Sequence, residues 1–395
     1  MMHSIVVISE LVAVLGCVTS CAYYLLCLRS AVGFLRGRKV AYENTCPRRT
    51  LPPVSILKPL KGTDPEIYES FRSHCVQDYP EYEIIFGVSD SGDPAVASVE
   101  KLRRQFPEHA IRLMICPEKL GSNSKVSNLE QMVKVARYEH LIVNDSDIRV
   151  ERDYLRRVMA QFVTETNDDA GVGMVTCLYR GIPARTFGSR LEALGISTDF
   201  CAGVLAARQL EGGLRFGLGS TLAFRRADLE RIGGFRAIVD FLADDYELGR
   251  RIAGLGREVR LSEAVVETRL PAYDLRGFWA HQLRWSRGVR DSRPGGYFGL
   301  VMTFGLMWAL LNLIVSHVAP WSWVMLGVVA LLRLAVALAV GKAVLRDQLL
   351  LQQLWLLPIR DLIAVAVWIA SFAGHTVAWR GDRFELKHGR LIRIA

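Results

Sequence analysis

Acidic side chains recur in this chain where an extended segment is expected to end. Asp90 follows the run 83–88, and the tripeptide Asp145-Ser146-Asp147 follows the run 141–143. Because alternate side chains of an extended segment point to the same side, Asp145 and Asp147 can reach one hard cation. Mg²⁺ or Mn²⁺ prefers such oxygen ligands and bridges a carboxylate to a diphosphate. The tripeptide therefore predicts a divalent-metal site, and the alternative is a solvated acidic turn.

A second acidic pair, Asp244-Asp245, precedes a helix-like run. One carboxylate can cap that helix while its neighbour faces a cleft. A carboxylate beside an incoming hydroxyl can take its proton as that oxygen attacks, which is general-base catalysis. The alternative is that both acids only cap the helix.

Two basic segments are candidates for meeting a nucleotide. Lys58 begins the segment 58–62 after the first expected strand, and the polar loop 121–128, with Lys125 and Asn128, runs into a helix. Backbone amides and a lysine at such a position can meet phosphate. The loop is neither a P-loop nor a Gly-x-Gly-x-x-Gly fingerprint, and Lys58 could instead lie on the surface.

The segment 281–285 (HQLRW) comes just before the C-terminal apolar region and is expected in an interfacial amphipathic helix. Arg284 can stabilise a diphosphate, and Trp285 can offer a flat apolar wall to a sugar or a lipid head. The alternative is that these residues only anchor the helix at a membrane.

Apolar runs alternate with amphipathic stretches over 51–296, which predicts an α/β domain with a mainly parallel sheet. In such sheets ligands bind at the carboxyl ends of the strands, where Asp90 and Asp145 lie. The glycine-containing segment 217–220 reads as a tight turn, or as part of an acceptor path. Strands are expected at 54–57, 83–88, 112–115, 140–143 and 173–177, and helices at 65–76, 95–106, 125–136 and 152–165.

The flanking regions are apolar enough for a membrane. A helix of about 20 residues crosses the hydrocarbon core, which predicts spans at about 8–28, 297–319, 321–341 and 359–379. We therefore divide the chain into 1–50 (membrane helix and basic linker), 51–296 (catalytic domain) and 297–395 (membrane region and basic tail). Arginines after the first span place the catalytic domain in the cytoplasm. Three C-terminal crossings would put the tail outside, whereas an interfacial or re-entrant 349–358 would keep it cytoplasmic.

Composition excludes several other classes. The formal charge of +9 comes without an aromatic-studded basic face, which argues against nucleic acid. The eight cysteines show no zinc spacing or disulfide framework. No Gly-x-Ser-x-Gly elbow, His-Glu-x-x-His or EF-hand occurs.

Together the patches resemble the ceramide glucosyltransferase type of inverting, nucleotide-sugar-dependent glycosyltransferase, over nearly the whole chain. The resemblance implies a GT-A-like domain, a UDP-sugar donor, a lipid acceptor and Mg²⁺ or Mn²⁺ as cofactor. It lies in the segments 54–62 (VSILKPLKG), 88–90 (VSD), 145–149 (DSDIR), 243–246 (ADDY) and 283–285 (LRW).

The same resemblance implies roles for individual residues. It implies Asp90 at the uridine, Asp145 and Asp147 at the metal and diphosphate, and Asp245 as the base. Arg284 and Trp285 would complete the donor or acceptor site, in which we also include Asp244 and His281. One departure concerns His281, because the family pattern usually has Gln or Arg at this place.

Within the group, the segments 175–181 (VTCLYRG) and 279–285 (WAHQLRW) look more like the bacterial hopanoid-biosynthesis branch. That branch implies transfer of N-acetylglucosamine to bacteriohopanetetrol at the inner membrane, whereas the ceramide branch implies UDP-glucose and ceramide. A processive polysaccharide synthase and a non-enzymatic membrane receptor are the remaining alternatives.

Overall fold

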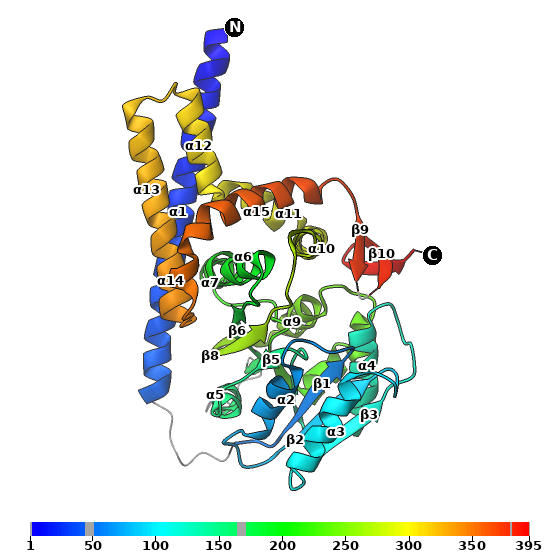
Figure 1. The fold of residues 1–395 in the computed structure, drawn as a ribbon. Helices are drawn as coiled ribbons and strands as arrows, with labels where there is room; N and C mark the ends of the chain where they lie inside the picture. The colour runs from blue at the N-terminus through cyan, green and yellow to red at the C-terminus, as the bar shows by residue number, and fades with distance from the viewer. Residues whose placement is uncertain (1, 44–50, 164–170, 380, 395) are drawn as a thin grey trace.

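The computed structural model describes residues 2–43, 51–163, 171–379 and 381–394. Helices from both ends of the chain stand together on one side of a domain built around a central sheet (Figure 1). The end of the predicted helix 152–165 and residues 44–50 of the basic linker lie outside the described residues. The earlier part of the expected linker is helical, because the first helix runs on to Glu43.

The central sheet has eight strands in the order β3-β2-β1-β4-β7-β6-β8-β5. β1 pairs in parallel with β2 and β4, β2 with β3, and β6 with β8, whereas β7 and β5 join the sheet antiparallel. The strands are β1 (Val54–Leu60), β2 (Tyr82–Val88), β3 (Ile111–Ile115), β4 (His140–Val143), β5 (Ile148–Arg149), β6 (Val172–Ile182), β7 (Leu222–Arg225) and β8 (Glu258–Arg269).

This arrangement confirms the predicted α/β domain with a mainly parallel sheet. All five predicted strands are present. Four of them, β1, β2, β4 and β6, are largely buried on both faces and read as nearly continuous apolar runs. The sequence did not reveal β8, in which buried and half-buried residues alternate, nor β7 and β5, which are short.

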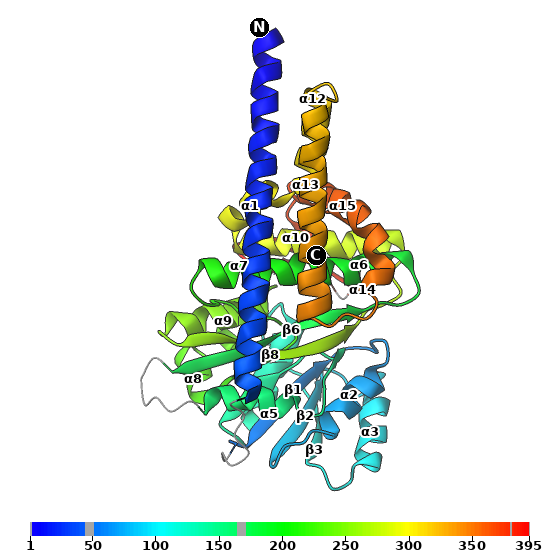
Figure 2. The ribbon, with the colours of Figure 1, turned by 90° about the vertical axis from the view of Figure 1, so that its left-hand side faces the viewer.

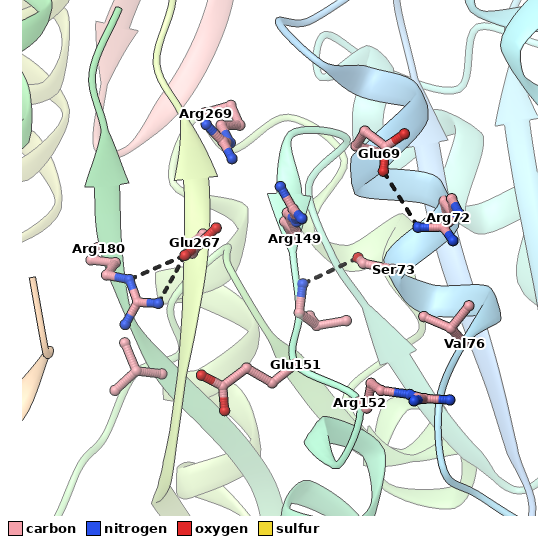
Figure 3. Close-up of a pocket in the computed structure, with 12 residues that line it drawn as sticks. Glu69, Arg72, Ser73, Val76, Arg149, Glu151, Arg152, Arg180, Glu267 and Arg269 are labelled. Atoms are coloured by element: carbon pink, nitrogen blue, oxygen red, sulfur yellow. Dashed lines mark hydrogen bonds and ion pairs between the residues drawn. The ribbon is translucent and has the colours of Figure 1, made fainter. Parts of the chain in front are cut away.

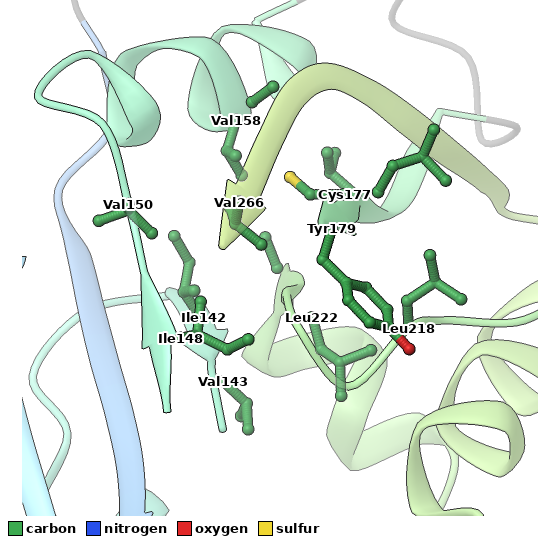
Figure 4. Close-up of a cluster of buried hydrophobic side chains, with 14 of the residues drawn as sticks. Ile142, Val143, Ile148, Val150, Val158, Cys177, Tyr179, Leu218, Leu222 and Val266 are labelled. Atoms are coloured by element: carbon green, nitrogen blue, oxygen red, sulfur yellow. The ribbon is translucent and has the colours of Figure 1, made fainter. Parts of the chain in front are cut away.

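Buried side chains between β4, β6 and β8 fix the strands whose ends carry the acids. Ile142 and Val143 of β4 and Val266 of β8 belong to one cluster with Leu222 (Figure 4). Tyr179 of β6 lies in the same cluster, next to Leu218. A close-packed core of this kind resists displacement of the strand ends that leave it.

The helices around the sheet largely follow the prediction. α2 (Ile67–Cys75), α3 (Ala95–Gln105), α4 (Ser124–Met132) and α5 (Tyr154–Met159) fall within the expected ranges to a residue or so, and α9 (Asp244–Gly254) follows the second acidic pair. Between β6 and β7 lie α6 (Phe187–Gly195), a π-helical turn η3 (Ile196–Phe200) and α7 (Cys201–Leu210).

Three helices are long and apolar enough to cross a membrane, within Val6–Arg38, Pro320–Val344 and Leu350–Ser371, among the described residues. A bent pair, Pro294–Thr303 with Gly305–Val315, brings the number to four if it forms one span. These segments indicate a membrane protein. α1 (Met2–Glu43), α12 (Gly305–Val315) and α13 (Pro320–Ala337) run side by side.

The last apolar segment differs from the expectation. α15 (Leu357–Ser371) ends before the predicted limit of 379, and Thr376–Trp379 form strand β9. α15 also lies across the direction of α1 and α13, beside α10 (Leu275–Ser292) (Figure 1). Helices that lie across the direction of α1, α12 and α13, where these meet the domain, are better suited to the membrane interface than to the hydrocarbon core of the membrane.

The basic tail folds into a three-stranded sheet of β9, β10 (Asp382–Lys387) and β11 (Arg390–Arg393). This sheet packs against the catalytic domain: Leu242 N donates to Gly389 O at 3.0 Å, and Leu391 N donates to Asp240 O at 2.7 Å. The tail therefore lies on the same side as the catalytic domain, in line with an interfacial last segment.

Candidate active site

The predicted acids meet at the carboxyl end of β4. β1 and β4 run in parallel register, Leu57 opposite Val143, so the loops that follow them begin at one edge of the sheet. Lys125, in the first turn of α4, reaches across this edge. Its Nζ lies 2.8 Å from Asp145 Oδ1 and 2.9 Å from Asp244 Oδ2. One ammonium thus joins the two acidic patches.

Gly219 separates Asp145 from Asp245. A Cβ at this glycine would lie 2.8 Å from Asp145 Oδ2 and 3.4 Å from Asp245 Oδ2. The Gly219 amide donates to Asp245 Oδ2 at 2.8 Å. The turn 217–220 is therefore part of the site, because a side chain at 219 would intrude between the carboxylates.

Asp245 is held in one orientation by two amides. Oδ2 accepts from Gly219 N, and Oδ1 accepts from Tyr246 N at 2.8 Å. Burial raises the pKa of Asp245 to about 6, and the neighbouring Asp244 adds to this effect. A carboxyl whose pKa lies near neutrality is suited to general-base catalysis.

Asp244 and Lys125 balance each other in charge. Burial alone would lower the pKa of Lys125, but the carboxylates of Asp145, Asp244 and Asp245 outweigh it and raise the pKa. Lys125 therefore stays protonated. Three carboxylates around one ammonium leave excess negative charge at this edge of the sheet.

Lys58 supports the acidic turn from below and does not lie on the surface. Its side chain is fully buried, and Nζ donates to the carbonyl oxygen of Asp145 at 3.0 Å. Burial lowers the pKa of Lys58 to about 7. The residue therefore positions the 145–147 turn, and contact with a nucleotide stays a prediction.

Asp147 points to β8, where Thr268 Oγ1 donates to its Oδ2. Burial raises the pKa of Asp147 to about 6, and the carboxylate of Asp145 raises it further. Part of the cost of ionising Asp147 therefore comes from a neighbouring negative charge.

These oxygens fit a divalent cation. Within the described ranges no three His, Cys, Asp or Glu side chains form a preassembled metal cluster. Mg²⁺ sites of nucleotide enzymes commonly use one or two carboxylates and take their other ligands from phosphate and water. Asp145 and Asp147, with the excess negative charge around them, meet that requirement.

The donor-side residues occupy the neighbouring strand end. Asp90 lies exposed after β2, where its Oδ1 accepts from Gly92 N at 3.0 Å. Ser89 Oγ donates to Asn128 Oδ1 at 2.9 Å, which ties this loop to α4. Pro59, Lys61, Lys125, Asn128 and Asp145 border one small space. No direct contact joins Asp90 to the carboxylate cluster among the residues described.

His281 lies on α10 against a buried acid. Its Nδ1 is 3.4 Å from Oε1 of Glu192, and Gln282 Nε2 donates to Oε2 of the same residue at 2.7 Å. The imidazole stacks on Tyr273 with centroids 5.2 Å apart and contacts Trp285 at 5.5 Å. The histidine that stands where the family usually has Gln or Arg thus lies beside a carboxylate of α6.

Aromatic rings connect α10 with the acids. Trp285, which remains 38% exposed, packs edge-on to Phe200 of the π-helical turn, and Phe200 packs against Tyr179. Burial raises the pKa of Tyr179, and carboxylates including Asp245 raise it further. The three rings form an aromatic wall that runs from α10 to β6.

Arg284 lies on the same helix as His281 and Trp285. Burial raises the pKa of Tyr273 to about 12, while the positive charge of Arg284 acts in the opposite direction. The pKa of Tyr273 is also raised by Asp147. The charges of Arg284 and Asp147 thus act on the pKa of Tyr273 in opposite directions.

The C-terminal sheet holds the loop before Asp244. Besides the two backbone bonds to the tail, Asp240 Oδ1 accepts from Ser122 N at 2.8 Å, and Asn123 Nδ2 donates to Phe241 O at 2.8 Å. Arg390 lies over the ring of Phe241 at 5.3 Å. The C-terminal sheet and the loop before α4 thus hold the segment 240–242, which precedes Asp244, from two sides.

Sequence analysis did not identify Glu192, Thr268 or the tail sheet as parts of the site. A lone acid in an apolar helix was the available signal for Glu192, since buried carboxylates are rare without a partner. Thr268 offered no signal, because only the pairing of β5 with β8 brings it to Asp147.

Comparison with known proteins identifies the family. The sequence model of Glycosyl transferase family 21 matches residues 12–392. Ceramide glucosyltransferases 1 and 3 of Caenorhabditis elegans are 22% and 24% identical, each over 98% of this chain and 82% and 83% of their own lengths. Ceramide glucosyltransferase of Komagataella phaffii is 35% identical over 26% of this chain and 22% of its own.

A solved structure shares the fold. A mannosyltransferase from Pyrobaculum calidifontis, in complex with GDP-Man and Mn²⁺, superposes with a TM-score of 0.50 at 21% identity and covers 91% of this chain and 97% of its own. The matched family covers nearly the whole chain, membrane helices and tail included. The chain therefore belongs to Glycosyl transferase family 21 and is a glycosyltransferase.

Proposed function

We propose that this glycosyltransferase transfers a sugar from a UDP-sugar to a hydroxyl of a membrane lipid, with inversion at the anomeric carbon. The observation that carries the proposal is the placing of Asp245. A buried carboxylate, fixed by two amides and with a raised pKa, lies beside the Asp145 turn and next to an aromatic wall that leads to the interfacial helices.

In the proposed reaction Asp245 accepts the proton of the lipid hydroxyl. The hydroxyl oxygen forms a bond to the anomeric carbon on the face opposite the diphosphate, and the bond from that carbon to the diphosphate breaks. UDP leaves, and an α-linked donor gives a β-glycoside. Bound at Asp145 and Asp147, Mg²⁺ or Mn²⁺ would neutralise the charge that builds on the leaving diphosphate.

Residues around the acids would bind the two substrates. Asp90 would contact the uridine, and Lys125 and Arg284 would meet the diphosphate as charge-assisted donors. The ammonium of Lys125 would then exchange part of its contact with Asp145 for phosphate oxygens.

The acceptor would enter from the interfacial helices. Trp279 and Trp285 on α10 are both more than one third exposed, as expected for rings that meet lipid head groups. Asp244, His281 and Trp285 would border the acceptor or donor sugar. The arginines that follow the first span favour a cytoplasmic catalytic domain on the inner membrane.

For the lipid, we propose bacteriohopanetetrol, with N-acetylglucosamine as the sugar. The support is the resemblance of 175–181 and 279–285 to the hopanoid branch. The second candidate is glucose transfer to ceramide, which is supported by the names of the relatives at 22% and 24% identity.

An assay of the purified full-length protein can separate the two candidates. It combines each donor, UDP-glucose or UDP-N-acetylglucosamine, with each acceptor, ceramide or bacteriohopanetetrol. Mass spectrometry identifies the product, and the proton coupling constant at the anomeric carbon gives its configuration. We expect one N-acetylglucosamine on the hopanoid in β-configuration. Glucosylceramide as the sole product would establish the second candidate, and an α-product would overturn the inverting mechanism.

A further inference from the structure

We propose that a second site, separate from the donor site, binds a phosphate-bearing anion at the membrane-proximal side of the sheet. A cavity of about 510 Å³ lies between α2, β5, β6 and β8, and its lining includes five arginines and three glutamates. Cavities of this size hold ligands as large as a lipid head group. The cavity shares no lining residue with the space beside Lys125 and Asp145.

The arginines of the cavity are only partly balanced. Arg180 pairs with Glu267 at 2.8 Å, and the exposed Arg72 approaches Glu69 at 3.7 Å. The half-buried Arg149 lies in the middle of the cavity (Figure 3), and its side chain has no hydrogen bond or ion pair with any residue in the part of the chain that the structure describes.

The exposed Arg152 also lines the cavity, and its side chain has no hydrogen bond or ion pair within the described ranges. A half-buried charge without a counter-charge is unfavourable, and an anion removes that cost. The planar guanidinium matches phosphate oxygens in bidentate fashion, which selects phosphate over a neutral polyol.

The cavity lies where two candidate membrane spans end. Arg180 Nη1 donates to the carbonyl oxygen of Leu345 at 2.8 Å, directly after the span Pro320–Val344. Arg38, the last residue of the span Val6–Arg38, donates from Nη2 to Val344 O at 2.8 Å. In Figure 2 the lower half of α1 passes in front of the central sheet, and α13 ends at the upper edge of that sheet. Anionic lipid head groups gather at basic clusters in such juxtamembrane positions.

Binding of an anion in this cavity would affect the active site through β8 and α2. Glu267 lines the cavity, and the next residue, Thr268, donates to Asp147. Ser70, beside the lining residue Glu69, donates from Oγ to Asp147 O at 3.3 Å. An anion that orders these strands would therefore steady the turn that carries the proposed metal ligands.

Thermal unfolding of the full-length protein in neutral detergent tests the proposal. The ligands are short-chain phosphatidylglycerol, phosphatidylcholine of the same chain length, inorganic phosphate and pyrophosphate, with sodium chloride at matched ionic strength. We expect phosphatidylglycerol to raise Tm in a saturable manner and phosphatidylcholine to have no such effect. Saturation by inorganic phosphate alone would identify a free anion as the ligand.

Arg149→Gln and Arg149→Lys provide the site-specific comparison, with Arg103→Gln on exposed α3 as the matched control. Loss of one bidentate, charge-assisted contact should raise the apparent Kd for the anion by about tenfold or more. Arg149→Lys keeps the charge, so it should fold and show an intermediate Kd. Equal Kd values in Arg149→Gln and Arg103→Gln, or equal Tm shifts with the two lipids and none with phosphate, would overturn the proposal.

Discussion

Replacing Asp245 with asparagine removes the proposed base but keeps a side chain of nearly the same shape. In the structure both carboxylate oxygens accept an amide hydrogen, from Gly219 and from Tyr246, each at 2.8 Å. Asparagine has one carbonyl oxygen, so one of the two amides loses its acceptor. That loss should cost about 1–3 kcal/mol of stability, which can be measured separately from catalysis.

The catalytic effect should be larger than the structural one. General-base catalysis contributes about 10²–10⁴-fold in rate, so kcat of Asp245→Asn should fall by that range while the donor KM changes little. In the native enzyme the raised pKa of about 6 means that Asp245 gains a proton as pH falls through 6. The rate at pH 5 should therefore be about one tenth of its plateau.

Initial rates between pH 5 and 8, with the donor and the acceptor varied in turn, provide the measurement. Asp244→Asn is the matched comparison, because it removes a partner of Lys125 but leaves the base. The pH profile of Asp244→Asn should keep a midpoint. The residual rate of Asp245→Asn, measured at a saturating metal concentration that keeps Asp147 ionised, should be nearly independent of pH. The base assignment fails if Asp245→Asn keeps more than about one tenth of the native kcat, or if it keeps the midpoint.

Four further changes test other parts of the structure. Asp147→Ala should raise the Mg²⁺ or Mn²⁺ concentration for half-maximal rate by about tenfold or more; an unchanged metal titration would remove Asp147 from the metal site. His281→Gln, which restores a residue usual in the family, should change the acceptor KM more than the donor KM, because the imidazole contacts Trp285 of the aromatic wall; the reverse order would place it on the donor side. Arg333→Met should destabilise the protein by about 1–3 kcal/mol, since it leaves the half-buried carboxylates of Asp199 and Asp361 without this counter-charge; an unchanged Tm in detergent would contradict this. Phe384→Ala should loosen the C-terminal sheet, seen as faster amide exchange in β9–β11, and lower kcat, because that sheet holds 240–242; faster exchange with an unchanged kcat would separate the tail from catalysis.

The fold could be predicted where the local sequence pattern shows which residues are buried. β1 is buried along its whole length and apolar apart from Ser55 and Lys58, and the first and third apolar segments are long enough to cross a membrane. The acids after β2 and β4 could be placed at one sheet edge, because parallel strands end together. The alternating pattern of β8 and the brevity of β5 and β7 gave no comparable signal.

The site was predictable only in its residue types. Asp145 and Asp244 could be singled out, but their common partner Lys125 depends on how α4 and α9 approach each other. Lys58 illustrates the same limit, because a lysine after a strand is ordinarily exposed, yet here it is fully buried beneath Asp145.

The sequence by itself determined the class of chemistry: acids after strands, a basic helix start, and apolar segments that bring a membrane to the site. The tertiary structure decided which groups act on one another. His281 meets Glu192, Asp147 meets Thr268, and the basic tail becomes a sheet that holds the loop before Asp244. The physical reason is that periodicity reveals which face of an element is buried, whereas the groups opposite that face come from distant segments and are fixed only by packing.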